Sequence, residues 1–448
     1  MPIKFFKDIP KSYYYLFLIV LISFIAKLIY VFYFSDYKNY LVSDMGGYWA
    51  RATNKFYGDT FSMNQWTAWS PSYHFYLFGI LKILYFLNLS NYGLEVVLFL
   101  NILYSAISIF CFYFIAEHLF KNSFQSLITT ACYAISYPIT YLNIFVLSEN
   151  ISIPIVIMSV YLLLTYYEKK HMLFITGLFL GIAVIIRPAL GLIGISFFLY
   201  ILLVNKPSFY STIRGFIFLA GYFIVIFLAL VEITYISKGE LKSLAGNGGV
   251  NFFISQCKPS IVKSENERGS VHVGSPNYYG DPNCKEFLTD HPIHDQKYFY
   301  KLGLECIKNN PNYWVENFIN LKAFFTGPLF PSLLSARGFT FLMPFSNYLL
   351  LFMSLTLGLL FWVKRDLNND ENKKIFFLLS IPALTVFVSY FYIPEQRYLF
   401  PVYFVIYLLF FLVFFNIEKH MKTAMIYSIT IIVINLSYIS YIWIKHLL

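Results

Sequence analysis

Four charged residues of this sequence lie beside apolar segments long enough to cross a membrane: Asp44, Glu149, Arg187 and Arg397. An ionisable side chain at the centre of a bilayer costs about 2.5–3.5 kcal/mol on insertion scales, so such residues are candidates for function. A carboxylate at the membrane surface can take a proton from a hydroxyl group or hold a divalent cation. An arginine can bind two phosphate oxygens with its planar guanidinium. Together, these residue types suit chemistry on a phosphate-bearing substrate.

Each of these residues also has a structural interpretation. Asp44 could pair with Arg51, and Arg397 could pair with Glu395. Glu149 would complement the dipole of the helix that it opens. For any of them, the side chain could simply reach the membrane interface. The sequence leaves both interpretations open.

The composition indicates a membrane protein. Hydrophobic residues make up 58% of the chain and charged residues 12%, against about 45–50% and about 25% in soluble domains. In a soluble protein the net charge of +10 would suggest a nucleic-acid partner. Here the cations follow the membrane topology, so we expect none. The pattern predicts an all-α polytopic membrane protein of about eleven transmembrane helices, at residues 14–34, 94–118, 125–145, 150–167, 173–186, 189–204, 214–236, 341–363, 375–392, 399–416 and 423–444.

Lysine and arginine are concentrated in alternate connections, as the positive-inside rule requires when the N-terminus is cytoplasmic. The first span is too long for the core of a signal peptide, so we expect an uncleaved anchor. Two long segments then lie outside, at about 35–93 and 237–340. The predicted organisation is an N-terminal transmembrane module that includes the first external loop (1–236), a large extracytoplasmic loop (237–340) and C-terminal transmembrane helices (341–448).

Two features interrupt the regular spans. Residues 72–88 are apolar, but counting them as a span would invert every later loop, so we predict a juxtamembrane or re-entrant helix. The short spans 173–186 and 189–204 meet at Arg187 and Pro188. Because proline disfavours helix at the preceding residue, we expect a helix end there that holds a cation at the external membrane surface.

The five cysteines divide by location. Cys111 and Cys132 fall within predicted spans and should behave as small apolar residues. Cys257, Cys284 and Cys306 fall in the large external loop, where one disulfide can form. The preferred pair is Cys257–Cys284.

The motifs around the charged residues resemble, in their order, those of GT-C superfamily glycosyltransferases, such as the lipid A aminoarabinose transferases and the protein O-mannosyltransferases. The motifs that carry the resemblance are SDMGGYWARA (43–52), WSPSYHFYLFGILK (69–82), LSENISIP (147–154), GLFLGIAVIIRPA (177–189), GNGGVNFF (246–253) and PEQRYLFP (394–401).

This resemblance implies a site between the first external loop and the central spans. Asp44 matches the acidic residue of the first loop, a catalytic base or metal ligand, and Glu149 matches a second catalytic carboxylate. Arg187 and Arg397 match ligands of the donor phosphate. A divalent cation is a candidate cofactor, with ligands that the sequence leaves open. Candidate substrate contacts within the motifs are Tyr48, His74 and Asn251.

The expected function is transfer of a sugar from a polyprenyl-phosphate donor to an extracytoplasmic acceptor, in the cytoplasmic (inner) membrane. Nucleotide sugars are absent outside that membrane, so the donor must arrive on a lipid carrier. Protein O-mannosyltransferases usually carry an Asp-Glu pair in the first loop, whereas Met45 follows Asp44 here. This favours a lipid or cell-envelope glycan over a protein as the acceptor. The alternative functions are a glycan polymerase or ligase, or a flippase for lipid-linked sugars.

Overall fold

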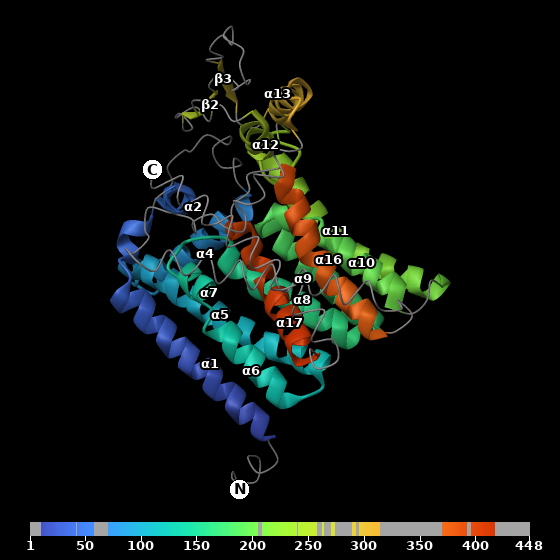
Figure 1. Cartoon of the computed structure of the whole chain (residues 1–448). Coiled ribbons are helices and arrows are strands. Elements are labelled where there is room, and N and C mark those ends of the chain that lie inside the picture. The colour runs from blue at the N-terminus through green and yellow to red at the C-terminus, as the bar shows by residue number, and fades with distance from the viewer. Residues whose placement is uncertain are drawn as a thin grey trace, which may run out of the picture.

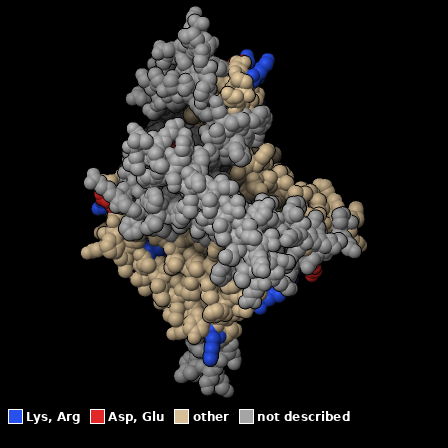
Figure 2. All heavy atoms as spheres, viewed as in Figure 1, with Lys and Arg blue, Asp and Glu red and all other residues tan. Residues whose placement is uncertain are grey.

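The computed structural model describes a bundle of helices with a small unit at one end (Figure 1). The described residues are 10–41, 43–57, 70–204, 208–239, 241–257, 262–263, 270–273, 289–292, 295–313, 370–391 and 396–416. The N-terminus lies at one end of the molecule, and α12, α13 and the strands lie at the opposite end. On the face that Figure 2 shows, the described surface is mostly uncharged, with few lysine, arginine or acidic atoms.

The elements of the N-terminal half are, in order, α1 (Lys11–Ile29), the π-helix η2 (Tyr30–Phe34), η3 (Tyr37–Tyr40), α2 (Ser43–Tyr57), α4 (Pro71–Phe86), η4 (Ser90–Tyr92), α5 (Gly93–Phe120), α6 (Ser123–Ala134), α7 (Tyr137–Leu142), α8 (Glu149–Tyr166), α9 (Lys170–Ile186), η5 (Pro188–Leu190), α10 (Ile193–Val204) and α11 (Phe209–Ile236). They are followed by α12 (Gly248–Cys257), β1 (Val262–Lys263), β2 (Ser270–Val273), β3 (Thr289–Pro292), α13 (Gln296–Asn309), α16 (Asp370–Phe391), η7 (Gln396–Val402) and α17 (Tyr403–Asn416).

The helical class predicted from the sequence is confirmed. Among the described residues, four helical segments are long and apolar enough to cross a membrane: Lys11–Phe34, Ser90–Phe120, Glu149–Tyr166 and Phe209–Ile236. Three shorter apolar helices accompany them, at Lys170–Ile186, Pro188–Val204 and Tyr398–Leu412. The predicted spans 341–363 and 423–444 lie outside the described residues, so the total of eleven stays a prediction.

Two local predictions need correction. The predicted span 125–145 is two helices, α6 and α7, because Pro138 occupies the first turn of α7 and cannot continue a helix from before it. The segment predicted as the large external loop also contains a three-stranded antiparallel sheet in the order β1-β2-β3, with Val262 opposite Val273 and Ser270 opposite Pro292. Its strands are too short for a period of two to be visible in the sequence.

Local sequence signals set the helix ends at the turn between α5 and α6. Lys121 ends α5 in the left-handed region, with φ +52°. Asn122 then caps α6, since its side-chain oxygen accepts hydrogen bonds from the backbone N–H groups of Phe124 (3.0 Å) and Gln125 (3.2 Å). The two helices can therefore pack side by side after a very short connection.

Helices α9 and α11 pack with their backbones in direct contact. A Cβ atom at Gly177 of α9 would overlap the carbonyl oxygen of Phe218, and one at Gly221 of α11 would overlap that of Phe174. Small residues allow this approach, which lets membrane helices associate without large side chains at the contact. Because Arg187 follows the last residue of α9, the contact fixes the helix end that presents this arginine.

A buried lysine joins α1 to α5. Lys27 is 2% exposed, and its Nζ donates a hydrogen bond to Ser105 Oγ at 2.7 Å. One turn earlier, Ser23 Oγ donates to the carbonyl oxygen of Ala134 at 3.1 Å. No role for Lys27 was predicted from the sequence, although an ammonium inside a span is costly unless it is bound to a partner.

Helices α12 and α13 share a small core of their own. Val250, Phe253 and Phe299 pack between α12 and α13. A disulfide joins the two helices between Cys257 and Cys306, with Cα atoms 5.3 Å apart. The predicted pairing of Cys257 with Cys284 is therefore wrong. The observed pairing follows from tertiary packing, because α13 brings Cys306 onto the end of α12. Cys284 lies outside the described residues.

We expect Ser105→Ala to lower the melting temperature of the purified protein more than Lys27→Met does. Removing the serine hydroxyl leaves a buried ammonium without its acceptor, which costs about 1–3 kcal/mol or more. Removing the charge instead leaves only a serine hydroxyl, which can bond to a carbonyl one turn earlier in its own helix. Thermal unfolding in detergent measures both. A larger drop in melting temperature for Lys27→Met than for Ser105→Ala would contradict this interpretation of the hydrogen bond between Lys27 and Ser105.

A second expectation concerns the disulfide. In protein that has not been reduced, Cys306→Ser should make Cys257 react with a thiol-alkylating reagent, because the variant removes its partner. The matched variant Cys284→Ser should leave Cys257 protected. Mass spectrometry of the alkylated peptides provides the readout. Protection of Cys257 in Cys306→Ser, together with its loss in Cys284→Ser, would restore the pairing expected from the sequence.

Candidate functional site

A buried ion pair joins the start of α8 to the end of α9. Arg187 Nη1 lies 2.7 Å from Glu149 Oε1, and the two side chains are 8% and 1% exposed. The other carboxylate oxygen, Oε2, accepts a hydrogen bond from Ser148 Oγ at 3.1 Å. Two of the four charged residues singled out in the sequence are therefore in direct contact.

An irregular segment places Glu149. Residues 143–148 are buried and lie between α7 and α8. Non-helical backbone at membrane depth is tolerated only where protein satisfies its polar groups. The amide nitrogens of Asn101 and Asn150 both donate to the carbonyl oxygen of Phe145, at 3.0 and 2.9 Å. Asn150 also donates to the carbonyl of Leu142 at 3.1 Å. These bonds replace the helical ones and fix the residue at which α8 begins.

Arg187 stands where Pro188 ends α9. Its backbone is extended, with φ −138° and ψ 90°, as expected for a residue before proline. Its Cζ atom lies 4.8 Å from the ring centre of Tyr398, a cation–π contact. Nε and Nη2 are buried and have no hydrogen-bond partner among the residues that the structure describes. Glu149 thus binds Nη1 and Tyr398 covers one face of the guanidinium, while Nε and Nη2 remain as two hydrogen-bond donors.

The late motif PEQRYLFP (394–401) contributes Tyr398 to the surroundings of Arg187. Helix η7, which contains Arg397, packs against α8, and the ring of Tyr398 covers Arg187. The side chain of Arg397 itself lies outside what the structure describes, so its predicted role at the phosphate stays a proposal. Tyr398 is a site residue that the sequence analysis missed, although it is the neighbour of a residue chosen there.

Tyrosines connect α2, in the segment predicted as the first external loop, to α4. The rings of Tyr48 in α2 and Tyr73 in α4 meet edge to face, with centres 4.9 Å apart. Tyr73 also stacks on Tyr76 at 6.0 Å. Burial raises the pKa of Tyr73, and its neighbours Tyr76, Tyr48 and Glu149 act in the same direction. Asp44 lies one turn before Tyr48 in α2, so the contact of Tyr48 with Tyr73 joins the helix that carries Asp44 to α4.

The remaining candidates have different surroundings. His74 is fully buried in α4, next to Tyr73, with its ring 5.4 Å from that of Phe75. Asn251 lies in α12, whose buried face packs against α13. The described contacts therefore place Asn251 in the unit of α12 and α13 rather than with the ion pair.

The described residues do not form a divalent-cation site. Both oxygens of Glu149 are engaged, one by Arg187 and one by Ser148. Within the described ranges, no three His, Cys, Asp or Glu side chains gather as metal ligands. The donor set at the ion pair is rich in N–H groups and suits an anion.

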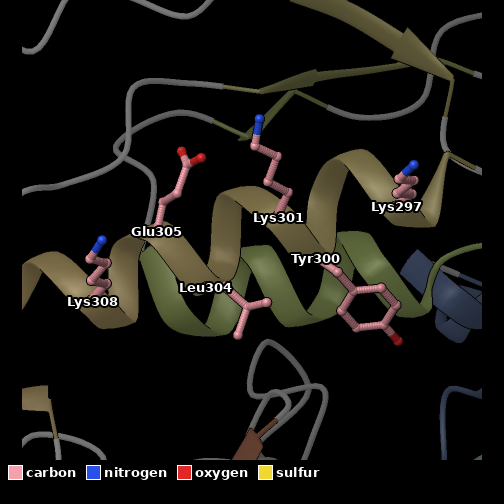
Figure 3. Close-up of a pocket in the computed structure, with 6 residues that line it drawn as sticks. All are labelled: Lys297, Tyr300, Lys301, Leu304, Glu305 and Lys308. Atoms are coloured by element: carbon pink, nitrogen blue, oxygen red, sulfur yellow. The ribbon is translucent and has the colours of Figure 1, made fainter.

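Two surface cavities lie apart from the ion pair. One, of about 510 Å³, lies on α13 and is lined by Lys297, Tyr300, Lys301, Leu304, Glu305 and Lys308 (Figure 3). The other, of about 520 Å³, is lined by apolar side chains of α1, α5 and α8 such as Val20, Phe110 and Met158. Neither includes Glu149 or Arg187.

Comparison with known proteins gives a family match for part of the chain. Residues 77–235 match the family described as dolichyl-phosphate-mannose-protein mannosyltransferase. The match confirms the resemblance to GT-C superfamily glycosyltransferases. It includes Glu149 and Arg187, whereas Asp44 and Arg397 lie outside it. No curated protein matches the sequence.

Two of the solved structures that match this chain come from Archaeoglobus fulgidus. One is the archaeal oligosaccharyltransferase AglB in complex with an inhibitory peptide and a dolichol-phosphate, with a TM-score of 0.46 and 14% identity, covering 92% of this chain and 51% of that one. Another is an oligosaccharyltransferase complex with Zn and sulfate, with a TM-score of 0.43 and 13% identity, covering 93% of this chain and 51% of that one. This chain thus spans about half the length of these proteins.

The ion pair predicts a specific pattern of stability. Arg187→Met leaves a buried carboxylate without its cation and should destabilise the protein by about 3–5 kcal/mol. Adding Glu149→Gln to that variant should recover part of the loss, because the uncompensated charge is removed. Thermal unfolding of both single variants and the double variant tests this. If the stability losses of the two single variants sum to that of the double variant within about 0.5 kcal/mol, the two side chains are not coupled.

Proposed function

We propose that this protein is an integral-membrane glycosyltransferase that moves a sugar from a polyprenyl-phosphate donor to a lipid or cell-envelope glycan outside the cytoplasmic membrane. The observation that carries the proposal is the state of Arg187, which is 7% exposed, anchored through Nη1 to Glu149, and equipped with two buried donors that have no partner among the described residues. The family match over residues 77–235 supports the same reaction class.

The free edge of Arg187 suits a phosphate. Nε and Nη2 present their hydrogens along one edge of the planar guanidinium, the arrangement that binds two oxygens of a phosphate at once. Glu149 and Tyr398 hold the group from the other sides, so it needs no rearrangement when the ligand arrives. Donors that are already oriented toward developing charge usually supply the largest catalytic contribution.

In the proposed reaction the acceptor hydroxyl gives its proton to a carboxylate, and its oxygen bonds to the anomeric carbon of the sugar. The bond between that carbon and the phosphate oxygen breaks, and its electron pair stays on the polyprenyl phosphate. Arg187 balances the charge that this leaving group gains. Arg397, by the same motif resemblance, would assist from η7.

Asp44 is the proposed base. Both oxygens of Glu149 are engaged, and a proton placed there would weaken the ion pair that orients Arg187. We therefore assign Glu149 to positioning, which revises its expected role as a second catalytic carboxylate. Asp44 lies in the first turn of α2, the helix whose Tyr48 contacts Tyr73 of α4, and this contact supports its assignment.

The proposal includes the placement of the site. Helices α12 and α13 lie at the end of the molecule opposite the N-terminus (Figure 1). With a cytoplasmic N-terminus, the large loop 237–340 would lie outside and cover the site, between the transmembrane modules 1–236 and 341–448.

Transfer from a polyprenyl-phosphate donor in purified membranes tests the assignment. We expect Arg187→Ala to lower transfer by about 10²–10³-fold and Arg187→Lys to recover part of it, because a point charge replaces a bidentate fork. Asp44→Asn should lose about 10²–10⁴-fold.

Lys170→Ala is the matched control, because Lys170 is exposed at the opposite end of the same helix. All variants are compared at equal protein abundance. Transfer by Asp44→Asn within about threefold of the unmodified protein is too small a loss for a general base and would remove that assignment. Unchanged transfer by Arg187→Ala would remove the phosphate site.

A further inference from the structure

Tyr73 carries a buried hydroxyl group that the fold does not use. Its side chain is 1% exposed, and its hydroxyl has no hydrogen-bond partner among the described residues. A buried hydroxyl without a partner is unfavourable, because it has given up its bonds to water. Such a group is retained at a cost to stability unless something outside the fold binds it.

The position of Tyr73 relates it to Arg187. Ser70, at the start of α4, donates a hydrogen bond from its Oγ to the carbonyl oxygen of Ile185, near the end of α9. Tyr73 lies one turn further along α4, and Arg187 lies two residues after Ile185. Tyr73 is also close enough to Glu149 for the carboxylate to raise its pKa. The unused donors of Tyr73 and Arg187 thus belong to one junction between α4, α8 and α9.

The Tyr73 ring is held in place by its neighbours. Tyr48 meets it edge to face at 4.9 Å and Tyr76 stacks on it at 6.0 Å. Tyr76 is fixed in turn, because its hydroxyl lies 2.6 Å from that of Tyr104 on α5. The hydroxyl of Tyr73 therefore has a defined position before any ligand binds.

The chemistry of the hydroxyl selects an anion. Burial raises the pKa of Tyr73, so the hydroxyl keeps its proton and can donate it in a hydrogen bond. The two free nitrogens of Arg187 are also donors only. The two Arg187 donors, with the Tyr73 hydroxyl at the same helix junction as a third, suit the oxygens of a phosphate.

We propose that the Tyr73 hydroxyl donates a hydrogen bond to the phosphate of the lipid-linked donor, beside Nε and Nη2 of Arg187. This inference rests on the proposed function and adds a binding residue that neither the sequence motifs nor the structural comparison assigns. Tyr73 would touch the leaving group itself, so its hydroxyl should matter for holding the phosphate and for departure of the phosphate from the sugar.

The test is binding of two probes to the purified full-length protein, a sugar-free polyprenyl phosphate and the polyprenyl alcohol that lacks the phosphate. Tyr73→Phe removes only the hydroxyl. We expect it to weaken binding of the phosphate about ten- to hundredfold, the range for a hydrogen bond to a charged group. Binding of the alcohol and the melting temperature should not fall.

Tyr133→Phe is the matched control. Tyr133 is also fully buried with a hydroxyl that lacks a partner among the described residues, but its ring stacks on Phe112 in the apolar core. This variant should bind both probes normally. Unchanged phosphate binding by Tyr73→Phe, an equal loss for both probes, or a lower melting temperature would each overturn the proposal.

Arg187→Ala separates this inference from the function on which it rests. If that variant loses phosphate binding while Tyr73→Phe does not, only the role of Tyr73 is wrong. If both variants bind the phosphate as the unmodified protein does, the phosphate site of the proposed function fails as well.

Discussion

The burial of one charged pair constrains the rest of this site. Glu149 and Arg187 are both nearly inaccessible, and two ions taken out of water are stable only in good geometry and with additional hydrogen bonds. Their helices must therefore begin and end at fixed residues. Ser148 supplies a further bond to the carboxylate, and Tyr398 supplies a ring to the guanidinium. One edge of the Arg187 guanidinium, formed by Nε and Nη2, has no partner among the described residues. This edge makes the site suitable for an anion.

The irregular segment 143–148 shows how a membrane fold supports such a pair. A continuous helix would satisfy its own carbonyls but could not place Glu149 at a helix start facing Arg187. The break exposes the carbonyls of Leu142 and Phe145, and asparagines from α5 and α8 bind them. Polar residues in the predicted spans thus have a structural reason to be there, separate from catalysis.

The sequence predicted those features that depend on a few neighbouring residues. Proline at position 188 marked the end of α9 and drew attention to Arg187. Glu149 was expected at the start of a helix, but its partner was not, because Arg187 is distant in sequence. The bond between Cys257 and Cys306 was missed for the same reason, since only the packing of α12 on α13 brings the sulfurs together. Tyr73 and Tyr398 were passed over because one tyrosine among 39 carries no local signal of burial beside a charge.

The close contact of α9 with α11 makes these helices a mechanical unit. Helix α11 leads into the segment 237–245, where the backbone N–H of Leu241 donates to Ser237 Oγ at 3.0 Å. Further along, Gln296 at the start of α13 donates to Ser243 Oγ at 2.6 Å and to the carbonyl of Ala245 at 2.7 Å. The contacts thus run without interruption from α13 through the segment 237–245 and α11 to the glycine contact with α9. Helix α9 ends at Ile186, so this path of packed backbone stops directly before Arg187.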